Sequence, residues 1–385
     1  MLTDYSLKMP KNIRAGEHAI EQFEEIISNG VHKIVVFTDK GLLGLGLVDL
    51  PIQIIEKAGI DYTVLSDIPA EPTYHEAQAV IDTFKKEAAD LVIAVGGDSV
   101  MDVAKLASIL ATDDYTVKDL LDDPLLAKKQ VPSLMIPTTA GTGAEATPNA
   151  IVRVPEKDLK IGIVNPEMIA DFVLLDGRMI KNLPKPIAAA TGVDALCHAI
   201  ECFTSAKANP ISDTFALEAL DLIMNNIIEA CTDPEALDAK RKMLLGSFYA
   251  GVAITASGTT AVHALSYPLG GKYHIAHGVS NAILLTPVMK FNEPAIKDLL
   301  AVAYDRVIKD GHKEWSIDEK SGYMIRQLDE IVKVLEIPTS LKTFNVPEED
   351  LDGLVAAGME VTRLLVNNKR EVTPEDARAI YLQIL

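Results

Sequence analysis

The sequence of 385 residues has few cysteines, few aromatic side chains and no excess of positive charge. Its three cysteines, Cys197, Cys202 and Cys231, do not form the paired spacing of a cysteine zinc site, so we expect free thiols in a reducing compartment. Aromatic residues make up 5%, which predicts a mostly aliphatic core. The 36 basic and 55 acidic residues give a net charge of -19, which argues against nucleic-acid and membrane partners, since both require a basic face.

Long apolar runs and targeting segments are also missing. No stretch reaches the roughly 18 consecutive apolar residues of a membrane span. The N-terminal segment MLTDYSLKMPKNIRAG lacks the basic region and apolar region of a secretory signal. We therefore expect a cytoplasmic protein, with a chain long enough for two domains.

Two halves of the sequence differ in pattern. From residue 30 to about 180, short apolar runs alternate with amphipathic helical stretches, which predicts an α/β domain with a Rossmann-like parallel sheet. The predicted strands are 33–39, 62–67, 91–97, 133–139 and 172–176, and the predicted helices are 49–58, 75–88 and 99–110. After Pro184 and Pro186 the pattern is helix after helix, so we expect an α/β domain over 1–180 and an all-α domain over 181–385.

Two glycine-rich loops follow predicted strands in the first half. VIAVGGDSVMDVAK places Gly96 and Gly97 before a helix that starts near Ser99, and IPTTAGTGAEAT places Thr138, Thr139 and Thr142 after the next strand. Glycines permit close approach of a ligand, and a helix N-terminus offers free N–H groups to phosphate. Either loop alone is equally explained as a tight turn, but the pair favours a dinucleotide site, although no GxGxxG motif occurs.

Asp39 ends the first clear strand. A carboxylate there can accept hydrogen bonds from ribose hydroxyls and repel a 2′-phosphate, which predicts NAD rather than NADP. The alternative is an aspartate that only caps a helix.

The second half contains a set of metal-ligand side chains in apolar surroundings. Asp194 and His198 lie four residues apart, on one face of the predicted helix TGVDALCHAIECF, and His263 and His277 follow in apolar segments. Any one of these histidines alone is more often a core residue. Together with a buried aspartate they indicate a four-ligand site for Fe2+ or Zn2+, and residue type does not choose between the two ions.

These motifs resemble the iron-containing (group III) alcohol dehydrogenase family along the whole chain. VGGDSVMDVAK resembles the family's GGGS-x-x-D-x-x-K, and IPTTAGTGAEAT resembles PTTAGTGSE-x-T. GVDALCHAIE resembles G-x-DAL-x-HA-x-E, and VHALSYPLGGKYHIAHG resembles the family's H-A-x(3)-P-L-G…HG segment.

The resemblance implies a dehydroquinate synthase-like fold with a dinucleotide domain, a helical metal domain and a cleft between them. It implies NAD(H) and Fe2+ (or Zn2+) as cofactors, a small alcohol or aldehyde as substrate, and a homodimer or larger homo-oligomer. Carried over by motif, the metal ligands are Asp194, His198, His263 and His277. The cofactor contacts are Asp39, Gly96, Gly97, Ser99, Asp102, Thr138, Thr139, Thr142 and Lys160, and Asn149 lines the substrate pocket.

Some positions depart from the family pattern. Asp98 replaces a glycine and would repel pyrophosphate unless it points outward, and Ala144 replaces a serine. Tyr267 stands where several members have a histidine, so proton transfer is open to Tyr267, His274 or water. Lys369 replaces a proline near the C-terminus without an expected chemical consequence.

Three other interpretations remain at this point. A sugar-phosphate cyclase requires several cations around the metal, whereas only Lys272 is near these motifs in sequence. A polyol oxidase of the glycerol dehydrogenase type uses fewer histidine ligands, and a non-catalytic metal- or nucleotide-binding protein would not turn over NADH. For the alcohol dehydrogenase, we expect a short-chain primary alcohol, a diol or its aldehyde as substrate. Ile254 is a candidate wall residue that a core position explains as well.

Overall fold

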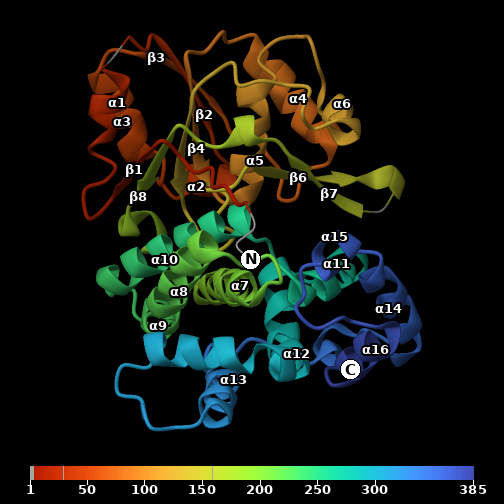
Figure 1. Ribbon diagram of the computed structural model, residues 1–385. Helices are drawn as coiled ribbons and strands as arrows, with labels where there is room; N and C mark the ends of the chain where they lie inside the picture. Colours follow the sequence, from red (N-terminus) through yellow and green to blue (C-terminus); the bar gives the residue numbers. More distant parts are fainter. Residues whose placement is uncertain (1–3, 29, 158) are drawn as a thin grey trace. The chain divides into compact units, whose positions relative to one another are not determined.

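The chain forms two compact units, which are described here from a computed structural model covering residues 4–28, 30–157 and 159–385. The α/β unit comprises Lys8–Thr139 and Gly143–Asn182. The helical unit comprises Leu183–Leu385, joined by residues 4–7 and 140–142 (Figure 1). Thr142 therefore belongs to the helical unit, whereas Thr138 and Thr139 belong to the α/β unit.

A six-stranded parallel sheet organises the α/β unit, in the order β1-β8-β5-β4-β2-β3. Its strands are β1 (Asn12–Ala15), β2 (Lys33–Phe37), β3 (Asp61–Leu65), β4 (Leu91–Gly96), β5 (Ser133–Pro137) and β8 (Phe172–Leu175). The central strands β4 and β5 are buried along their whole length, as the continuous apolar runs require. All five predicted strands are present, and the predicted fold class is confirmed.

Helices cover the sheet on both faces. They are α1 (Phe23–Ile27), α2 (Lys40–Gly44), α3 (Asp49–Lys57), α4 (Tyr74–Lys85), α5 (Asp98–Ile109) and α6 (Val117–Asp122), with short 3-10 turns η1 (Pro155–Lys157), η2 (Pro166–Met168) and η3 (Gly177–Ile180). Residues of α1 and α3 pack with Ile34, Ile93 and Ile136 in one apolar cluster. The start of α4 is set by a capping box between Thr73 and Glu76.

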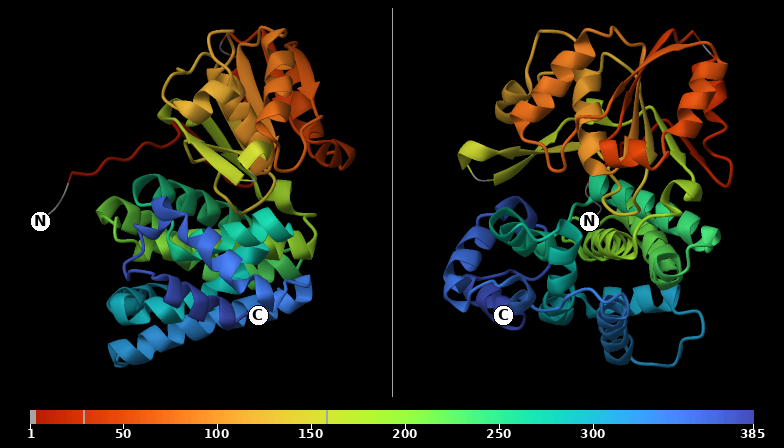
Figure 2. Two further views of the ribbon diagram at one scale, coloured as in Figure 1. Left: turned by 90° about the vertical axis from the view of Figure 1, so that its right-hand side faces the viewer. Right: turned by 180° about the vertical axis from the view of Figure 1, so that it is seen from behind.

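Three strands were not predicted. β1 has only four residues, none of them fully buried, so it carries no apolar run. The antiparallel pair β6 (Asn149–Val154) and β7 (Leu159–Val164) forms a separate two-stranded sheet. Figure 2 shows this hairpin extending beyond the main sheet, which accounts for the alternation of buried and exposed side chains along β6.

The helical unit packs around α7 (Lys185–Thr204). Its other helices are α8 (Pro210–Met224), α9 (Ile227–Thr232), α10 (Leu237–Ala256), α11 (Ala261–Tyr273), α12 (His277–Val307), α13 (Ile317–Val334), α14 (Leu351–Met359), α15 (Thr362–Leu365) and α16 (Pro374–Leu382), with 3-10 turns η4 (Leu341–Phe344) and η5 (Glu348–Asp350). Among the described helices, only α7 is long and apolar enough to cross a membrane. However, 78% of its most apolar segment is buried inside the protein, which is typical of the core helix of a globular protein.

A close backbone approach joins α12 to α7. A Cβ atom on Gly278 would lie 2.1 Å from the carbonyl oxygen of Ala190, so only glycine fits at this position. Because His277 is the neighbouring residue, this contact brings its side chain next to the face of α7 that carries Asp194.

Candidate metal centre

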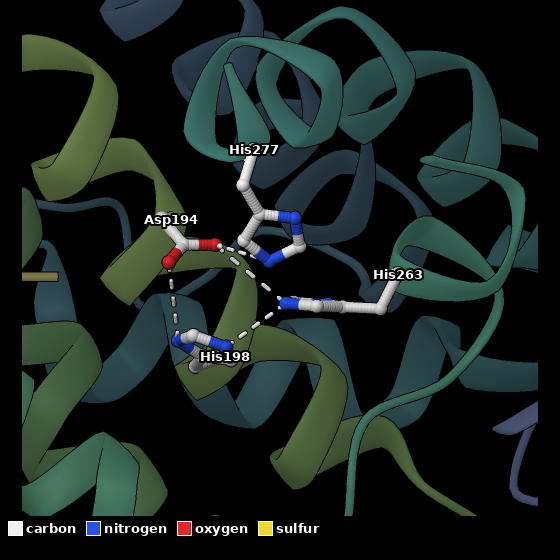
Figure 3. A group of neighbouring side chains, drawn as sticks. All are labelled: Asp194, His198, His263 and His277. Atoms are coloured by element: carbon white, nitrogen blue, oxygen red, sulfur yellow. Dashed lines mark hydrogen bonds and ion pairs between the residues drawn. The ribbon is translucent and has the colours of Figure 1, made fainter. Parts of the chain in front are cut away.

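Four side chains from three helices converge in the helical unit (Figure 3). Asp194 and His198 come from α7, His263 from α11 and His277 from the first position of α12. Nε2 atoms of His263 and His277 lie 3.6 and 3.5 Å from Oδ1 of Asp194, and Nε2 of His198 lies 2.9 Å from Nε2 of His263. One ligand atom from each residue lies within 4.8 Å of those from the other three.

The tetrad is buried except on one side. The side chains of Asp194, His198 and His263 are 3%, 7% and 3% exposed, whereas that of His277 is 33% exposed. A small molecule would therefore reach the centre past His277.

Burial and mutual charge shift the pKa values of the tetrad. Burial lowers the pKa of His198 to about 4, and the neighbouring imidazoles add to this effect, so this ring is neutral near pH 7. Burial opposes ionisation of Asp194, but the three imidazoles hold the pKa of its carboxyl far below the ordinary value. Burial opposes protonation of His263, but Glu201 and Asp194 raise its pKa to about 9, so this ring must release a proton when it binds a metal ion, whereas Asp194 is already ionised and His198 already neutral.

Glu201, on the same face of α7, orients one ligand. Its Oε2 atom contacts Nδ1 of His263, and its Oε1 atom accepts hydrogen bonds from the Thr260 amide and hydroxyl and the Val262 amide at 3.1, 2.6 and 2.7 Å. A carboxylate at Nδ1 directs Nε2 of His263 toward the other three ligands. The metal-ligand spacing alone does not predict Glu201, although its position seven residues after Asp194 is a usable signal.

Asn281, one turn after His277 on α12, was missed as well. Its Nδ2 atom lies 2.6 Å from Oδ1 of Asp194, 3.1 Å from Nε2 of His263 and 3.2 Å from Nε2 of His277. One amide with two hydrogens therefore faces three lone-pair atoms, while Nδ1 of His198 makes no hydrogen bond within the described part of the chain. The donor set, one carboxylate and three imidazoles, fits a divalent ion of the Fe2+ or Zn2+ type, which would satisfy these lone pairs together.

The candidate proton-relay residues differ in their position. Tyr267, one turn after His263 on α11, has its ring centroid 6.0 Å from that of His277. His274 is exposed, adopts a left-handed conformation with φ of 54° at the end of α11, and is not among the contacts of the tetrad. The one cation expected near these motifs, Lys272, pairs instead with Asp350.

In the α/β unit, the two glycine- and threonine-containing loops lie side by side. The Thr138 amide donates to the carbonyl oxygen of Gly96 at 3.1 Å, and a Cβ atom on Gly97 would lie 3.6 Å from Oγ1 of Thr139. A Cβ atom on Gly96 would lie only 2.6 Å from Cβ of Val100, so α5 packs against β4 through this glycine. The pair of loops meets at the carboxyl edge of β4 and β5, where parallel sheets bind ligands.

Several polar groups at or beside the predicted cofactor loops already have protein partners. Oδ1 of Asp39 caps α2 by accepting from the Leu42 amide at 2.9 Å, and Oδ1 of Asp98 accepts from the Ser99 amide at 2.8 Å. Ser99 and Lys160 both contact Glu71. Oγ of Ser99 accepts a hydrogen bond from the Glu71 amide at 3.0 Å, and Nζ of Lys160 pairs with the Glu71 carboxylate at 2.5 Å.

Asp102 belongs to a buried network with Lys105. Its carboxylate pairs with Nζ of Lys105 at 2.7 Å and accepts from the Ile151 amide at 2.8 Å. The same ammonium group donates to the carbonyl oxygens of Ala144 and Asn149, so this network holds the threonine loop and the start of β6. Asn149 is half-buried in the α/β unit, and Ile254 is half-buried on α10 of the helical unit.

Comparison with known proteins agrees with this arrangement. The model of the iron-containing alcohol dehydrogenase family matches residues 10–177, and the model of its C-terminal domain matches residues 188–385. The chain belongs to the iron-containing alcohol dehydrogenase family. It is therefore an oxidoreductase of the alcohol dehydrogenase type, and the family resemblance seen in the sequence is confirmed.

Relatives of this alcohol dehydrogenase match it along almost its whole length. A long-chain-alcohol dehydrogenase of Geobacillus thermodenitrificans is 34% identical over 97% of this chain and 94% of its own. The structure of a 1,3-propanediol oxidoreductase aligns with a TM-score of 0.92 and 27% identity over 100% of both chains. A sulfoacetaldehyde reductase of Bifidobacterium kashiwanohense, solved in complex with NAD+, aligns with a TM-score of 0.89 and 28% identity over 100% of this chain and 99% of its own.

Proposed function

We propose that this protein interconverts a short-chain primary alcohol or diol and its aldehyde, using NAD(H) and Fe2+ held by the tetrad. The observation that carries the proposal is the buried convergence of Asp194, His198, His263 and His277, open only on the side of His277. Zn2+ satisfies the same donor types, and the iron-containing family favours Fe2+. Reduction of the aldehyde by NADH is the proposed physiological direction.

Each part of the chain has a separate task in this reaction. When bound, the metal ion acts as a Lewis acid toward the substrate oxygen and NAD(H) donates or accepts the hydride. Glu201 orients His263 through Nδ1, and the side chains of Asp194, His198 and His263 are almost completely shielded from water. The hydroxyl of Tyr267, whose ring lies beside His277, is the proposed group for holding the transferred proton, in preference to the exposed His274.

The preference for NAD(H) rests on the loops of the α/β unit. Gly96, Gly97, Thr138 and Thr139 lie together at the carboxyl edge of the sheet, where a pyrophosphate would meet the N-terminus of α5. Asp39 places a carboxylate after β2, which disfavours the 2′-phosphate of NADP. The structural relative in complex with NAD+ supports the same cofactor.

The test is NADH oxidation by anaerobically purified protein with short aldehydes, with Fe2+ added or removed by a chelator. We expect turnover that depends on Fe2+ and is faster with NADH than with NADPH. His263→Ala should lose bound iron, measured by elemental analysis, together with turnover. The matched control is His312→Ala, at an exposed histidine outside the tetrad, which should keep both. Binding of NADH without reduction of any aldehyde in the presence of Fe2+ or Zn2+ would refute the proposal.

A further inference from the structure

Arg363 lies close to the metal centre through a chain of two contacts. It belongs to α15, which packs against α11 (Figure 1). Its Nη2 atom donates to the hydroxyl of Tyr267 at 3.4 Å. The ring of Tyr267 in turn lies 6.0 Å from the ring of His277, centroid to centroid. The side chain of Tyr267 thus links the guanidinium group to His277, the partly exposed member of the tetrad.

The charge of Arg363 is not balanced by a protein carboxylate. Arg363 is exposed, and within the described part of the chain it forms no ion pair. Several other cations of the helical unit, among them Arg241 and Arg306, do pair with acids. Lys272, at the end of α11, illustrates the contrast through its pairing with Asp350.

We propose that Arg363 binds an oxyanionic group on the substrate, so that the preferred aldehyde carries a carboxylate or a similar anion a few bonds from its reacting carbon. The inference rests on the proposed function, since it assumes that the reacting oxygen is held at the tetrad. A guanidinium presents a planar set of N–H donors that matches an oxyanion with two parallel hydrogen bonds. The single long bond to Tyr267 leaves the other donors of Arg363 available for such a group.

The expected selectivity follows from the strength of hydrogen bonds to charged groups. Such a hydrogen bond changes binding affinity by about 10- to 100-fold. We therefore expect kcat/KM for the negatively charged substrate to exceed that for a neutral analogue by about the same factor. The cofactor also carries oxyanions, so the experiment must separate a contact with substrate from a contact with NADH phosphates.

The experiment compares succinate semialdehyde with butanal. The two aldehydes have the same chain length, but succinate semialdehyde ends in a carboxylate where butanal ends in a methyl group. For the iron-loaded wild-type protein we expect kcat/KM to be at least about 10-fold higher for succinate semialdehyde. Arg363→Met should lower the ratio of the two kcat/KM values about 10-fold or more, and Arg363→Lys should lower it less, because the charge remains without the planar donors. Arg326→Met, at an exposed arginine of α13, is the matched control and should keep the wild-type ratio. Thermal unfolding of each variant checks folding.

The outcomes separate the two proposals. Turnover of both aldehydes with no preference, and no change in the ratio in Arg363→Met, would overturn the role of Arg363 and leave the dehydrogenase function in place. A raised Kd for NADH in Arg363→Met, with an unchanged ratio, would assign the arginine to the cofactor and overturn the inference. Absence of turnover with either aldehyde would overturn the proposed function itself.

Discussion

Two buried glutamates, one in each unit, differ in their surroundings. Glu201 in the helical unit is 0% exposed, and Glu145 in the α/β unit is 3% exposed. Both oxygens of Glu201 have partners, with three donors on Oε1 and His263 on Oε2. Oε1 of Glu145, by contrast, has no hydrogen-bond partner within the described residues.

The difference shows that partners, and not burial alone, decide the protonation of a buried carboxyl. Burial opposes ionisation of Glu201, but His263, the Thr260 hydroxyl and the Val262 amide hold its pKa below the ordinary value. At Glu145 the same burial raises the pKa to about 7, because Lys105 and the glutamate's own amide oppose it only weakly. Glu201 can therefore orient a metal ligand as an anion, whereas Glu145 carries a proton over much of the acidic pH range.

The strongest test of this comparison is Glu145→Gln. The pKa of Glu145 is about 7 in the folded chain, whereas its ordinary value, expected in the unfolded chain, is 4.5. The stability that the protonated group contributes is therefore fully present below pH 4.5 and is lost as pH rises to about 7. Relative to Glu145→Gln, the wild-type free energy of unfolding should fall by about 3 kcal/mol between pH 4 and pH 8. Urea unfolding at both pH values measures this, with the exposed Asp122→Asn as control. A difference that does not vary with pH would contradict the raised pKa.

Glu201→Gln tests the other half of the comparison. Loss of the anion at Nδ1 of His263 should weaken metal binding by about 10- to 100-fold, the usual effect of removing a partner that orients a ligand. Competition with a chromogenic chelator gives the affinity directly, without reference to turnover. Glu229→Gln, at an exposed glutamate of α9, is the control. Equal metal affinity of Glu201→Gln and wild type would show that His263 is oriented without Glu201.

A smaller effect is expected at Asp98, where a carboxylate lies at the N-terminus of a helix predicted to bind phosphate. The Asp98 carboxylate accepts from the Ser99 amide and adds negative charge where pyrophosphate would bind. Asp98→Asn should therefore lower the Kd for NADH about 2- to 5-fold. Fluorescence titration with NADH measures the change, and Asp49→Asn in the first turn of α3 serves as control. Weaker NADH binding in Asp98→Asn would mean that the carboxylate supports the cofactor loop.

Much of the fold was predictable because its signals are local. The fully buried strands β4 and β5 appear as continuous apolar runs, and α5 starts directly after Gly97. The strand β1 was not predicted because it is short and lacks an apolar run, whereas the β-branched residues of β6 and β7 were a usable strand signal that the prediction did not include. The four metal ligands were proposed from spacing and apolar surroundings, and the structure brings these same residues together.

By itself, the sequence determined the order of elements, the two glycine- and threonine-containing loops and the four metal-ligand side chains, because periodicity and short motifs depend on neighbours along the chain. Only the tertiary structure decided which groups act on those ligands. Glu201 and Asn281 contact His263 across 62 and 18 positions of sequence, and Arg363 reaches Tyr267 across 96. Such contacts depend on how helices pack against one another, and the spacing of residues along the chain does not record that packing.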